Sequence, residues 1–249
     1  MKHHNPCARF ATDGFAVLRQ YQTPAQVDAL RSEVQRFIDT RLPALPREEV
    51  FYEDKQDAGT LKQIQRMHLH DPFFESLTVD SPLHHLATEL LGQAVRPVNL
   101  QYFNKPPQIG KATPAHQDGY YFMLEPNEAV TLWLALDDVD EENGCIRYIP
   151  GSHRRGLRPH GRTQTLGFSQ GLLDFGADDK QREVVLPARP GDLLAHHSLT
   201  IHRADANGSA TRTRRALGFV YFAVASTVNK DQQRRHAQLM QDLRTAGKI

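Results

Sequence analysis

Thr113-Pro-Ala-His-Gln-Asp-Gly-Tyr-Tyr-Phe122 is the stretch that decides which fold and which chemistry we expect of this chain. At its centre, one residue separates His116 from Asp118. In a β-strand, residues i and i+2 point to the same face, so the two side chains can converge on one point. A distant histidine would complete a two-histidine, one-carboxylate triad, which leaves three positions open on an octahedral Fe(II). His-x-Asp alone is common, so the rest of the chain has to support the site.

Length and composition limit the class of protein. The chain has 249 residues, enough for one β-rich domain, which we expect to span 1–249. Thirty Lys and Arg against 29 Asp and Glu leave a formal net charge of +1, which gives no reason to expect nucleic acid or a membrane surface as a partner. Apolar runs are too short to cross a bilayer, and no signal-peptide pattern follows Met1. Cys7 and Cys145 lie far apart, which favours a reducing, cytoplasmic setting over a disulfide framework.

Helical signals dominate the N-terminal part of the chain. Thr23-Pro24-Ala25-Gln26 predicts a helix start, with Thr23 as the N-cap and Gln26 as the reciprocal cap. Apolar residues follow at helical spacing and predict one buried face: Val27, Leu30, Val34, Phe37 and Ile38. A second helix is expected from Ser81 through Leu91, with Gly92 ending it.

Short strands are expected elsewhere. In the N-terminal part we expect a strand over Phe10–Leu18, a surface loop over Glu48–Gly59 and a strand over Leu61–Met67. From Val95 onward the expected strands are Val95–Phe103, Val130–Leu136, Ile146–Ile149, Glu183–Leu186, Asp192–His196 and Ala216–Val224. The polar stretch from Lys230 predicts a C-terminal helix. Helices followed by strands and turns indicate a mainly β domain, with a double-sheet barrel or sandwich as its core.

Two further groups could complete a site around His116 and Asp118. His202 is expected to start a segment after a turn, and its spacing to the next arginine-rich strand favours it over His196 and His197. On that strand Arg214 alternates with Ala216 and Gly218 on one face. A buried guanidinium is costly unless an anion meets it, and a dicarboxylate co-substrate is a suitable partner.

The ordered set of motifs resembles the phytanoyl-CoA dioxygenase family. The set is His116-x-Asp118, Trp133, Glu142-Asn-Gly-Cys-Ile-Arg-Tyr-Ile-Pro-Gly-Ser-His153, His202 and Arg214. The resemblance runs from about Phe10 to Phe222. It implies a double-stranded β-helix, a jelly-roll or cupin-like core with flanking helices. It also implies Fe(II), 2-oxoglutarate and O2 as cofactors and co-substrates.

Carried over by position, the resemblance implies roles for individual residues. His116, Asp118 and His202 match the metal ligands, and Arg214 matches the partner of the distal carboxylate of 2-oxoglutarate. Its spacing from His202 is about one residue longer than the family pattern, so Arg212 and Arg215 remain alternatives. Three more residues are expected near the co-substrate: Lys62 and Trp133 by position, and Gln101 because its strand could reach the same place.

The implied reaction is hydroxylation of an aliphatic C–H of a small metabolite, with release of succinate and CO2. Asp118 favours hydroxylation, because related halogenases have a small residue there that frees a site for chloride. An acyl-CoA 2-hydroxylase is the alternative substrate variant. A non-catalytic barrel that binds a metal or a small ligand is a different class that stays open. A zinc hydrolase would also use two histidines and a carboxylate, but it gives a buried arginine no role.

A basic segment between the expected strands is the candidate for substrate recognition. Arg154, Arg155, Arg158, His160 and Arg162 begin a stretch that continues through Gly167, Gly171 and Gly176. So long an insertion predicts a lid over the metal, although a solvated charged face is the simpler interpretation. As a lid, it would place Arg154 and Arg158 against a substrate with a carboxylate, phosphonate or phosphate. The apolar side of the pocket would then be formed by Tyr120, Tyr121 and Phe122.

Overall fold

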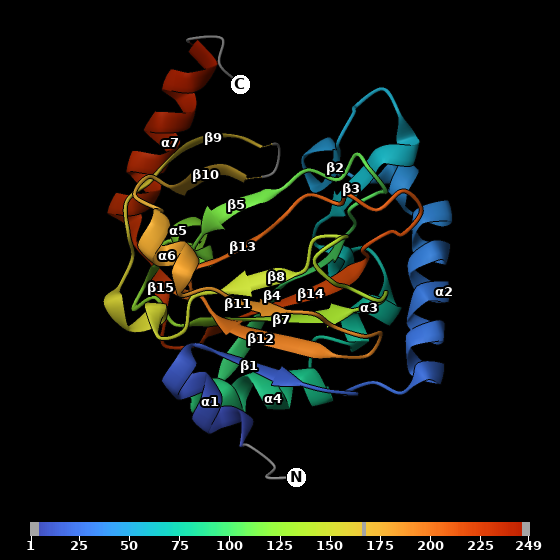
Figure 1. The fold of residues 1–249 in the computed structure, drawn as a ribbon, viewed down its shortest axis with the longest axis horizontal. Coiled ribbons are helices and arrows are strands. Elements are labelled where there is room, and N and C mark those ends of the chain that lie inside the picture. The colour runs from blue at the N-terminus through green and yellow to red at the C-terminus, as the bar shows by residue number, and fades with distance from the viewer. Residues whose placement is uncertain (1–4, 166–167, 246–249) are drawn as a thin grey trace.

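The core of the protein is a pair of antiparallel sheets, seen in a computed structural model that describes residues 5–165 and 168–245 (Figure 1). The large sheet has seven strands in the order β1-β12-β7-β14-β4-β3-β2, and the small sheet has four in the order β11-β8-β13-β5. Strands far apart in sequence alternate within each sheet. This is the mainly β jelly-roll architecture with flanking helices that the sequence predicts.

The strands of the large sheet are β1 (Phe15–Leu18), β2 (Val50–Tyr52), β3 (Leu61–Ile64), β4 (Val95–Phe103), β7 (Ala129–Ala135), β12 (Leu193–His197) and β14 (Ala216–Ala223). Those of the small sheet are β5 (Thr113–His116), β8 (Ile146–Tyr148), β11 (Val184–Leu186) and β13 (His202–Ala204). Two strand pairs stand apart, β6 (Leu124–Glu125) with β15 (Thr227–Val228) and β9 (His160–Thr165) with β10 (Phe168–Leu172). The helices are α1 (Pro6–Asp13), α2 (Pro24–Thr40), α3 (Pro72–Ser76), α4 (Pro82–Leu91), α5 (Asp118–Phe122), α6 (Ala177–Gln181) and α7 (Lys230–Thr245).

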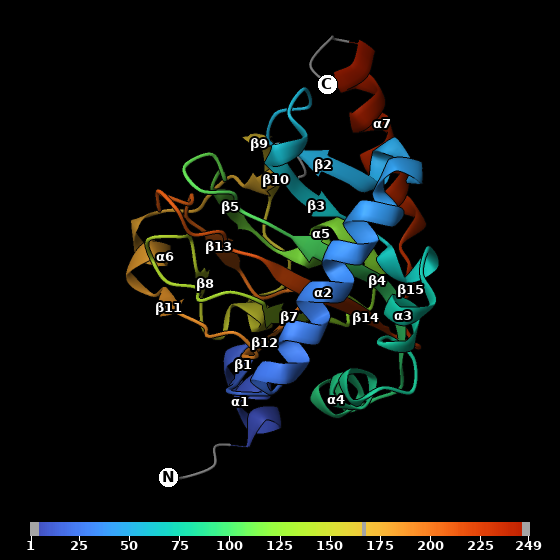
Figure 2. The same cartoon turned by 90° about the vertical axis from the view of Figure 1, so that its right-hand side faces the viewer.

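The two faces of the large sheet have different roles because side chains alternate along each strand. The outer face packs with α1, α2 and α4 into the main hydrophobic core, where Leu100, Leu132 and Phe219 are fully buried. Figure 2 shows α2 crossing the sheets, and Figure 1 shows α1 and α4 at the end opposite β9 and β10. The inner face looks toward the small sheet and is partly polar.

The register arranges the inner face of the large sheet in rows. In the first row Thr131 pairs with His196 on one side and Val220 on the other, and Val220 pairs with Asn99. The second row runs through Leu194, Trp133, Gly218 and Gln101, and the third through Ala135, Ala216 and Phe103. These rows define positions along the cavity described below.

Local sequence patterns predicted the ends of these helices correctly. The Thr23 hydroxyl accepts from the Gln26 backbone N–H at 3.4 Å, and the Gln26 side-chain oxygen accepts from the Thr23 N–H at 2.8 Å. At α4, Ser81 caps the first turn, and Gly92 at φ 66° ends the helix in the left-handed conformation. The expected strand Val95–Phe103 has those same bounds in the structure.

Three local expectations were wrong. The first half of Phe10–Leu18 belongs to α1, because Asn5 caps a helix that Pro6 starts and Gly14, at φ 83°, ends it. The Glu48–Gly59 stretch is not only a loop, since β2 lies inside it and pairs with β3. The strand expected over Leu61–Met67 stops at Ile64, because Arg66 takes a left-handed φ of 54° and starts a 3-10 turn.

Within the described part of the chain, no helix combines the length and apolar character needed to span a bilayer.

Candidate metal centre

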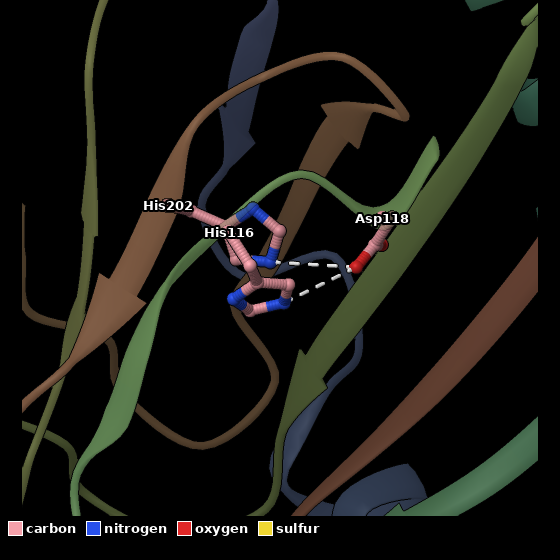
Figure 3. A group of neighbouring side chains, drawn as sticks. All are labelled: His116, Asp118 and His202. Atoms are coloured by element: carbon pink, nitrogen blue, oxygen red, sulfur yellow. Dashed lines mark ion pairs between the residues drawn. The ribbon is translucent and has the colours of Figure 1, made fainter. Parts of the chain in front are cut away.

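His116, Asp118 and His202 meet at one point between the sheets (Figure 3). β5 ends at His116 rather than running through Asp118, which is the first residue of α5. Gln117 between them is nevertheless extended, at φ −124° and ψ 126°, so the i and i+2 side chains still point the same way. His202 starts β13 and pairs directly opposite His116.

The three side chains present the ligand atoms that a metal needs. The Nε2 atoms of His116 and His202 lie 3.4 and 3.6 Å from Asp118 Oδ1, and the possible ligand atoms all lie within 4.8 Å of one another. The Nδ1 atoms lie 2.8 and 3.0 Å from the carbonyls of Pro114 and Thr200. A carbonyl can only accept, so each Nδ1 carries the proton and each Nε2 offers a lone pair.

The second carboxylate oxygen of Asp118 is occupied by protein groups. Thr131 donates its hydroxyl to Oδ2 at 2.7 Å, and His196 Nε2 lies 3.2 Å from the same atom. On the far side of the His196 ring, the Tyr148 hydroxyl lies 2.8 Å from Nδ1. Burial raises the pKa of Tyr148 well above its usual value, so the phenol keeps its proton and donates to Nδ1. His196 is thereby left with Nε2–H to donate, and Asp118 directs only Oδ1 toward the two histidines.

Charge is distributed unequally over the metal centre. Burial by itself would raise the pKa of Asp118. The neighbouring imidazoles of His202, His116 and His196 outweigh that effect and hold the pKa of Asp118 well below its usual value. Burial lowers the pKa of His202 well below its usual value, with His116 and His196 acting in the same direction. The site therefore offers one carboxylate and two imidazole nitrogens, which is the donor set of a divalent-metal site.

Gln117 ties the metal-binding turn to its surroundings. It is fully buried, and its amide nitrogen donates to the carbonyls of Gly156 at 2.9 Å and Leu199 at 2.7 Å. Its amide oxygen accepts from the Arg158 N–H at 2.8 Å. Its backbone N–H donates to His160 Nε2 at 3.1 Å. Gln117 therefore joins the turn to two loops that are remote in sequence.

Sequence reasoning missed four positioning residues: Gln117, Thr131, Tyr148 and His196. For His196 a signal existed, because alternation along β12 turns His196 and Leu194 inward and leaves His197 outward. His197 lies against Glu128 at 3.2 Å instead. Nothing in the local sequence marks the other three.

Arg214 is a buried cation without a carboxylate partner in the described part of the chain. It lies two residues before β14, is 5% exposed, and donates from Nε to the Gly144 carbonyl at 3.0 Å. Its Cζ lies 5.1 Å from the centroid of the Trp133 ring, a cation–π contact. Burial lowers the pKa of Arg214 to about 10, so it stays charged at neutral pH.

The two neighbouring arginines have partners outside the cavity. Arg212 forms an ion pair of 2.8 Å with Asp140, and Arg215 forms one of 2.8 Å with Asp137. Neither lines the cavity that holds the metal centre, whereas Arg214 does. The geometry therefore favours Arg214 among the three alternatives.

Lys62, Gln101 and Trp133 line the same cavity as the metal centre. A bulge in the β2–β3 pairing leaves Lys62 unpaired between Leu61 and Gln63. Its Nζ forms an ion pair with Glu53 Oε1 at 3.2 Å. Burial lowers the pKa of Lys62 against the opposing effect of Glu53.

The donor set and the buried cations fit a metal-bound dicarboxylate. His116, Asp118 and His202 provide three ligand atoms that lie within 4.8 Å of one another. Arg214 and Lys62 provide buried positive charge elsewhere in the same cavity. A divalent ion that keeps open positions, with an acid reaching from it to Arg214, would satisfy both groups.

The expected substrate residues divide into two groups. Tyr121 and Phe122 line the cavity. The Tyr121 hydroxyl donates to the Gln170 carbonyl and accepts from the Gln170 N–H at 3.2 Å, which ties this wall to β10. Tyr120 does not line the cavity; its ring stacks on His160 with centroids 4.4 Å apart.

Arg154 and Arg158 do not line the cavity, contrary to expectation. Arg154 donates to the Thr12 carbonyl on the surface. Arg158 is neutralised by Asp174 and Asp179, at 2.9 Å each. The segment expected to be a lid is largely the β9–β10 hairpin, which lies beside β5. Gly167, which belonged to that expectation, lies outside the described residues.

The family model described as phytanoyl-CoA dioxygenase (PhyH) matches residues 10–216. The chain belongs to the phytanoyl-CoA dioxygenase family. It is 32% identical over 166 residues to phytanoyl-CoA dioxygenase domain-containing protein 1 of Mus musculus, a match covering 65% of this chain and 57% of that protein. To the peroxisomal phytanoyl-CoA dioxygenase of Bos taurus it is 27% identical over 218 residues, covering 80% and 63%. The chain thus spans about half to two thirds of the length of the curated relatives it matches.

Solved structures resemble this one over nearly the whole chain. EvdO2 from Micromonospora carbonacea var. aurantiaca, complexed with 2-oxoglutarate, superposes with a TM-score of 0.71 at 28% identity, covering 92% of this chain and 93% of that one. SnoK, a non-heme alpha-ketoglutarate-dependent carbocyclase from nogalamycin biosynthesis, gives 0.71 at 26% identity, covering 90% and 85%. The family match and the structural likeness both place the chain among proteins with the fold of 2-oxoglutarate-dependent oxygenases.

Proposed function

We propose that this chain, as a single domain over 1–249, hydroxylates an aliphatic C–H of a small metabolite with Fe(II), 2-oxoglutarate and O2. His116, Asp118 and His202 hold the metal, and Arg214 holds the distal carboxylate of 2-oxoglutarate. One observation carries the proposal: a His-Asp-His cluster shares its cavity with a buried guanidinium that has no carboxylate partner among the described residues.

Fe(II) and 2-oxoglutarate, when bound, supply the oxidising chemistry: one oxygen atom of O2 enters the C–OH product, the other enters succinate, and CO2 leaves. The chain supplies geometry. Thr131 and His196 hold Asp118 so that one oxygen faces the metal position. Arg214, stacked on Trp133, fixes the far end of the co-substrate, with Lys62 adding positive charge. Tyr121 and Phe122 close part of the cavity and help to exclude water.

Two other classes of function fit the cavity less well. A zinc hydrolase could use the same three ligands, but it has no task for Arg214. A non-catalytic barrel that binds a small ligand would not need both the open metal triad and the carboxylate partner. An acyl-CoA 2-hydroxylase remains the alternative within the same chemistry, and it differs in substrate only.

Succinate formation tests the proposal. The protein is loaded with Fe(II) without oxygen, then given 2-oxoglutarate, O2 and candidate metabolites, and succinate is counted against hydroxylated product. We expect succinate formation from the wild type and its loss in Asp118→Ala, together with loss of tight Fe(II) binding. Normal iron binding and hydroxylation by Asp118→Ala would show that the ligand assignment is wrong. Iron binding without any succinate from the wild type would favour the non-catalytic alternative.

A further inference from the structure

Five carboxamide side chains line the cavity of the metal centre. Asn104 lies beside Lys62, and the other four form one group: Gln63, Gln65, Asn99 and Gln101. They come from the adjacent strands β3 and β4 and the turn that follows β3. Burying an amide without a hydrogen-bond partner costs free energy, so a wall of carboxamides needs either internal partners or a ligand. This group is called the carboxamide wall below.

Internal hydrogen bonds satisfy only part of the carboxamide wall. The Gln101 oxygen accepts from the Gln63 amide at 2.8 Å and from the Asn99 amide at 3.4 Å. The Asn99 oxygen accepts from the Arg66 backbone N–H at 2.8 Å. Gln63 is 4% exposed, and its buried oxygen has no hydrogen-bond partner among the described residues. No described residue accepts from the Gln101 amide nitrogen, so the wall offers the cavity both an acceptor and a donor.

The rows of the large sheet show that this wall starts beside the metal and runs along the cavity toward the Arg214 end. Asn99 belongs to the row of Thr131, whose hydroxyl bonds to Asp118. Gln101 belongs to the next row, with Gly218 and Trp133, and Gln63 pairs with Phe103 in the third row. A Cβ on Gly218 would come within 2.8 Å of the Phe103 ring and 3.4 Å of the Gln101 amide nitrogen, so glycine there leaves room for both side chains.

The cations of the cavity lie away from Asp118, at the Arg214 end, or are already neutralised. The Asn104 N–H donates to the Lys62 carbonyl, and the next residue, Lys105, exchanges two backbone hydrogen bonds with Arg214, which places Lys62, Lys105 and Arg214 at one end of the cavity. Lys105 Nζ donates to the carbonyls of Lys111 and Asp205 at 2.9 and 2.6 Å. Arg203 pairs with Glu183 and Asp205.

The sequence between β9 and β10 adds no charge. Residues 163–169 contain no ionisable side chain. In the described part of the chain, therefore, no unpaired cation lies beside Asp118 to receive an anionic substrate.

From this distribution we propose that the substrate is an uncharged, hydrogen-bonding molecule, with hydroxyl or carboxamide groups close to the C–H that is oxidised. This inference rests on the proposed function, since it assigns the substrate class of the same site. The carboxamide wall binds the polar groups, and Tyr121, Phe122 and Val220 contact the carbon skeleton. A fatty acyl chain would leave the Gln63 oxygen and Gln101 amide unpaired, and a phosphate ester would find no free cation. Sites built to hydrogen-bond a polar group discriminate strongly against analogues that lack it.

Matched pairs of probes test the class. Binding is measured by ligand-observed NMR on oxygen-free protein loaded with Fe(II) and 2-oxoglutarate. The neutral probes are glucose, inositol and N-acetylglucosamine; the charged counterparts are glucose 6-phosphate and N-acetylglucosamine 6-phosphate; the apolar probes are palmitate and palmitoyl-CoA. We expect binding, and stimulation of succinate release, from the neutral set. Preference for a phosphate ester or an acyl probe, or no binding by any neutral probe, overturns the proposal.

Variants of the wall separate its role from that of the metal centre. Gln65→Met keeps the length of a side chain that makes no hydrogen bond with the described protein, and Gln63→Met removes the unpaired oxygen. We expect each to weaken binding of a neutral probe about ten-fold or more. Gln35→Met, on the exposed face of α2, is the matched control and should bind like the wild type. If Gln63→Met and Gln65→Met bound the neutral probe as tightly as Gln35→Met and the wild type, with unchanged melting temperatures, the proposal would be contradicted. If the wild type bound the neutral probes but formed no succinate, the proposed reaction would be contradicted. The role of the carboxamide wall in binding would still be supported.

Discussion

At the scale of single residues, His196 decides how Asp118 can bind a metal. A carboxylate with two free oxygens can chelate an ion through both. Here Oδ2 already accepts from Thr131 and His196, and Tyr148 fixes the His196 ring from behind. Hydrogen bonds of this kind to a ligating group are worth about 10- to 100-fold in metal affinity. The structure therefore predicts a monodentate Asp118.

Replacing His196 should weaken metal binding although it is not a ligand. We expect His196→Leu to lose about 10- to 100-fold in Fe(II) affinity, measured by titration without oxygen, and His196→Gln to recover part of it by donating to Oδ2. His197→Leu is the control, because the neighbouring ring points to Glu128. Unchanged Fe(II) affinity in His196→Leu would show that His196 does not position Asp118 for metal binding. Spectra of the Co(II)-loaded protein that show three histidine ligands would make His196 a ligand instead.

Arg214 should control the affinity for the co-substrate. Truncating one member of a buried charge pair costs about 2–5 kcal/mol, so Arg214→Ala should raise the apparent KM for 2-oxoglutarate by roughly two orders of magnitude. Arg215→Ala should change it little, because Arg215 pairs with Asp137 outside the cavity. Steady-state succinate formation measures both. A large effect in Arg215→Ala with none in Arg214→Ala would move the role to the neighbour.

Sequence spacing predicted the residues that act locally and missed those that act across strands. The geometry of His116 and Asp118 follows from their i, i+2 spacing, and it is kept even though the strand ends between them. Thr131 and Tyr148 reach Asp118 and His196 only through strand pairing, which the sequence does not specify. The placement of Arg158 failed for the same reason, because Asp174 and Asp179 are 16 and 21 residues away and neutralise it.

At the scale of elements, the turn between β5 and α5 depends on the loop that leads into β9. His160 Nδ1 faces the Arg158 carbonyl at 2.8 Å and therefore carries the proton. Its Nε2 accepts from the Gln117 backbone N–H. A second proton on this ring would break the bond to Gln117. Burial lowers the pKa of His160 to about 4, which is the expected direction for a ring held neutral.

The free energy of unfolding should decrease as the pH is lowered, because the unfolded state then takes up a proton on His160 that the folded state does not. Between its usual value of 6.5 and about 4, the unfolded chain binds this proton and the folded chain does not. The contribution of His160 is therefore complete above pH 6.5 and is lost as the pH falls toward 4. His160→Gln retains an acceptor for Gln117 and should flatten the dependence in that window. Urea unfolding at several pH values measures it, with His85→Gln on α4 as the control. An unchanged slope in His160→Gln would assign the dependence to other groups.

Helices were easier to predict than strand ends. Thr23 and Gln26 satisfy each other within one turn, so their capping box needs no tertiary context. β2 has three residues and no alternating pattern, and it is a strand only because β3 pairs with it. The α1 helix was missed because its signal, Asn5 with Pro6, precedes the apolar residues that suggested a strand.

At the scale of the whole molecule, the hydrophobic core and the metal centre lie on opposite faces of the large sheet. The main core packs the outer face against α1, α2 and α4, and it contains none of the metal-binding side chains. The inner face gives up part of its apolar packing to Thr131, His196 and the carboxamides. In such an arrangement, folding does not need the metal, unlike in small domains that a metal holds together.

Metal removal should therefore leave the fold intact. We expect protein treated with EDTA to melt in one cooperative transition, because the outer-face core is complete without an ion. A divalent ion that binds only the folded state adds about 2.7 kcal/mol at 100 times its Kd. For a chain of this size, that corresponds to a rise in Tm of roughly 5–11 °C. Scanning calorimetry with and without Mn(II), which avoids oxidation, measures the shift. Asp118→Ala is the control and should melt cooperatively without a metal-dependent shift, because the ion loses the carboxylate while the core keeps every contact. Loss of the cooperative transition in EDTA would mean that the ion holds the two sheets together, and the separation of core from site would then be wrong.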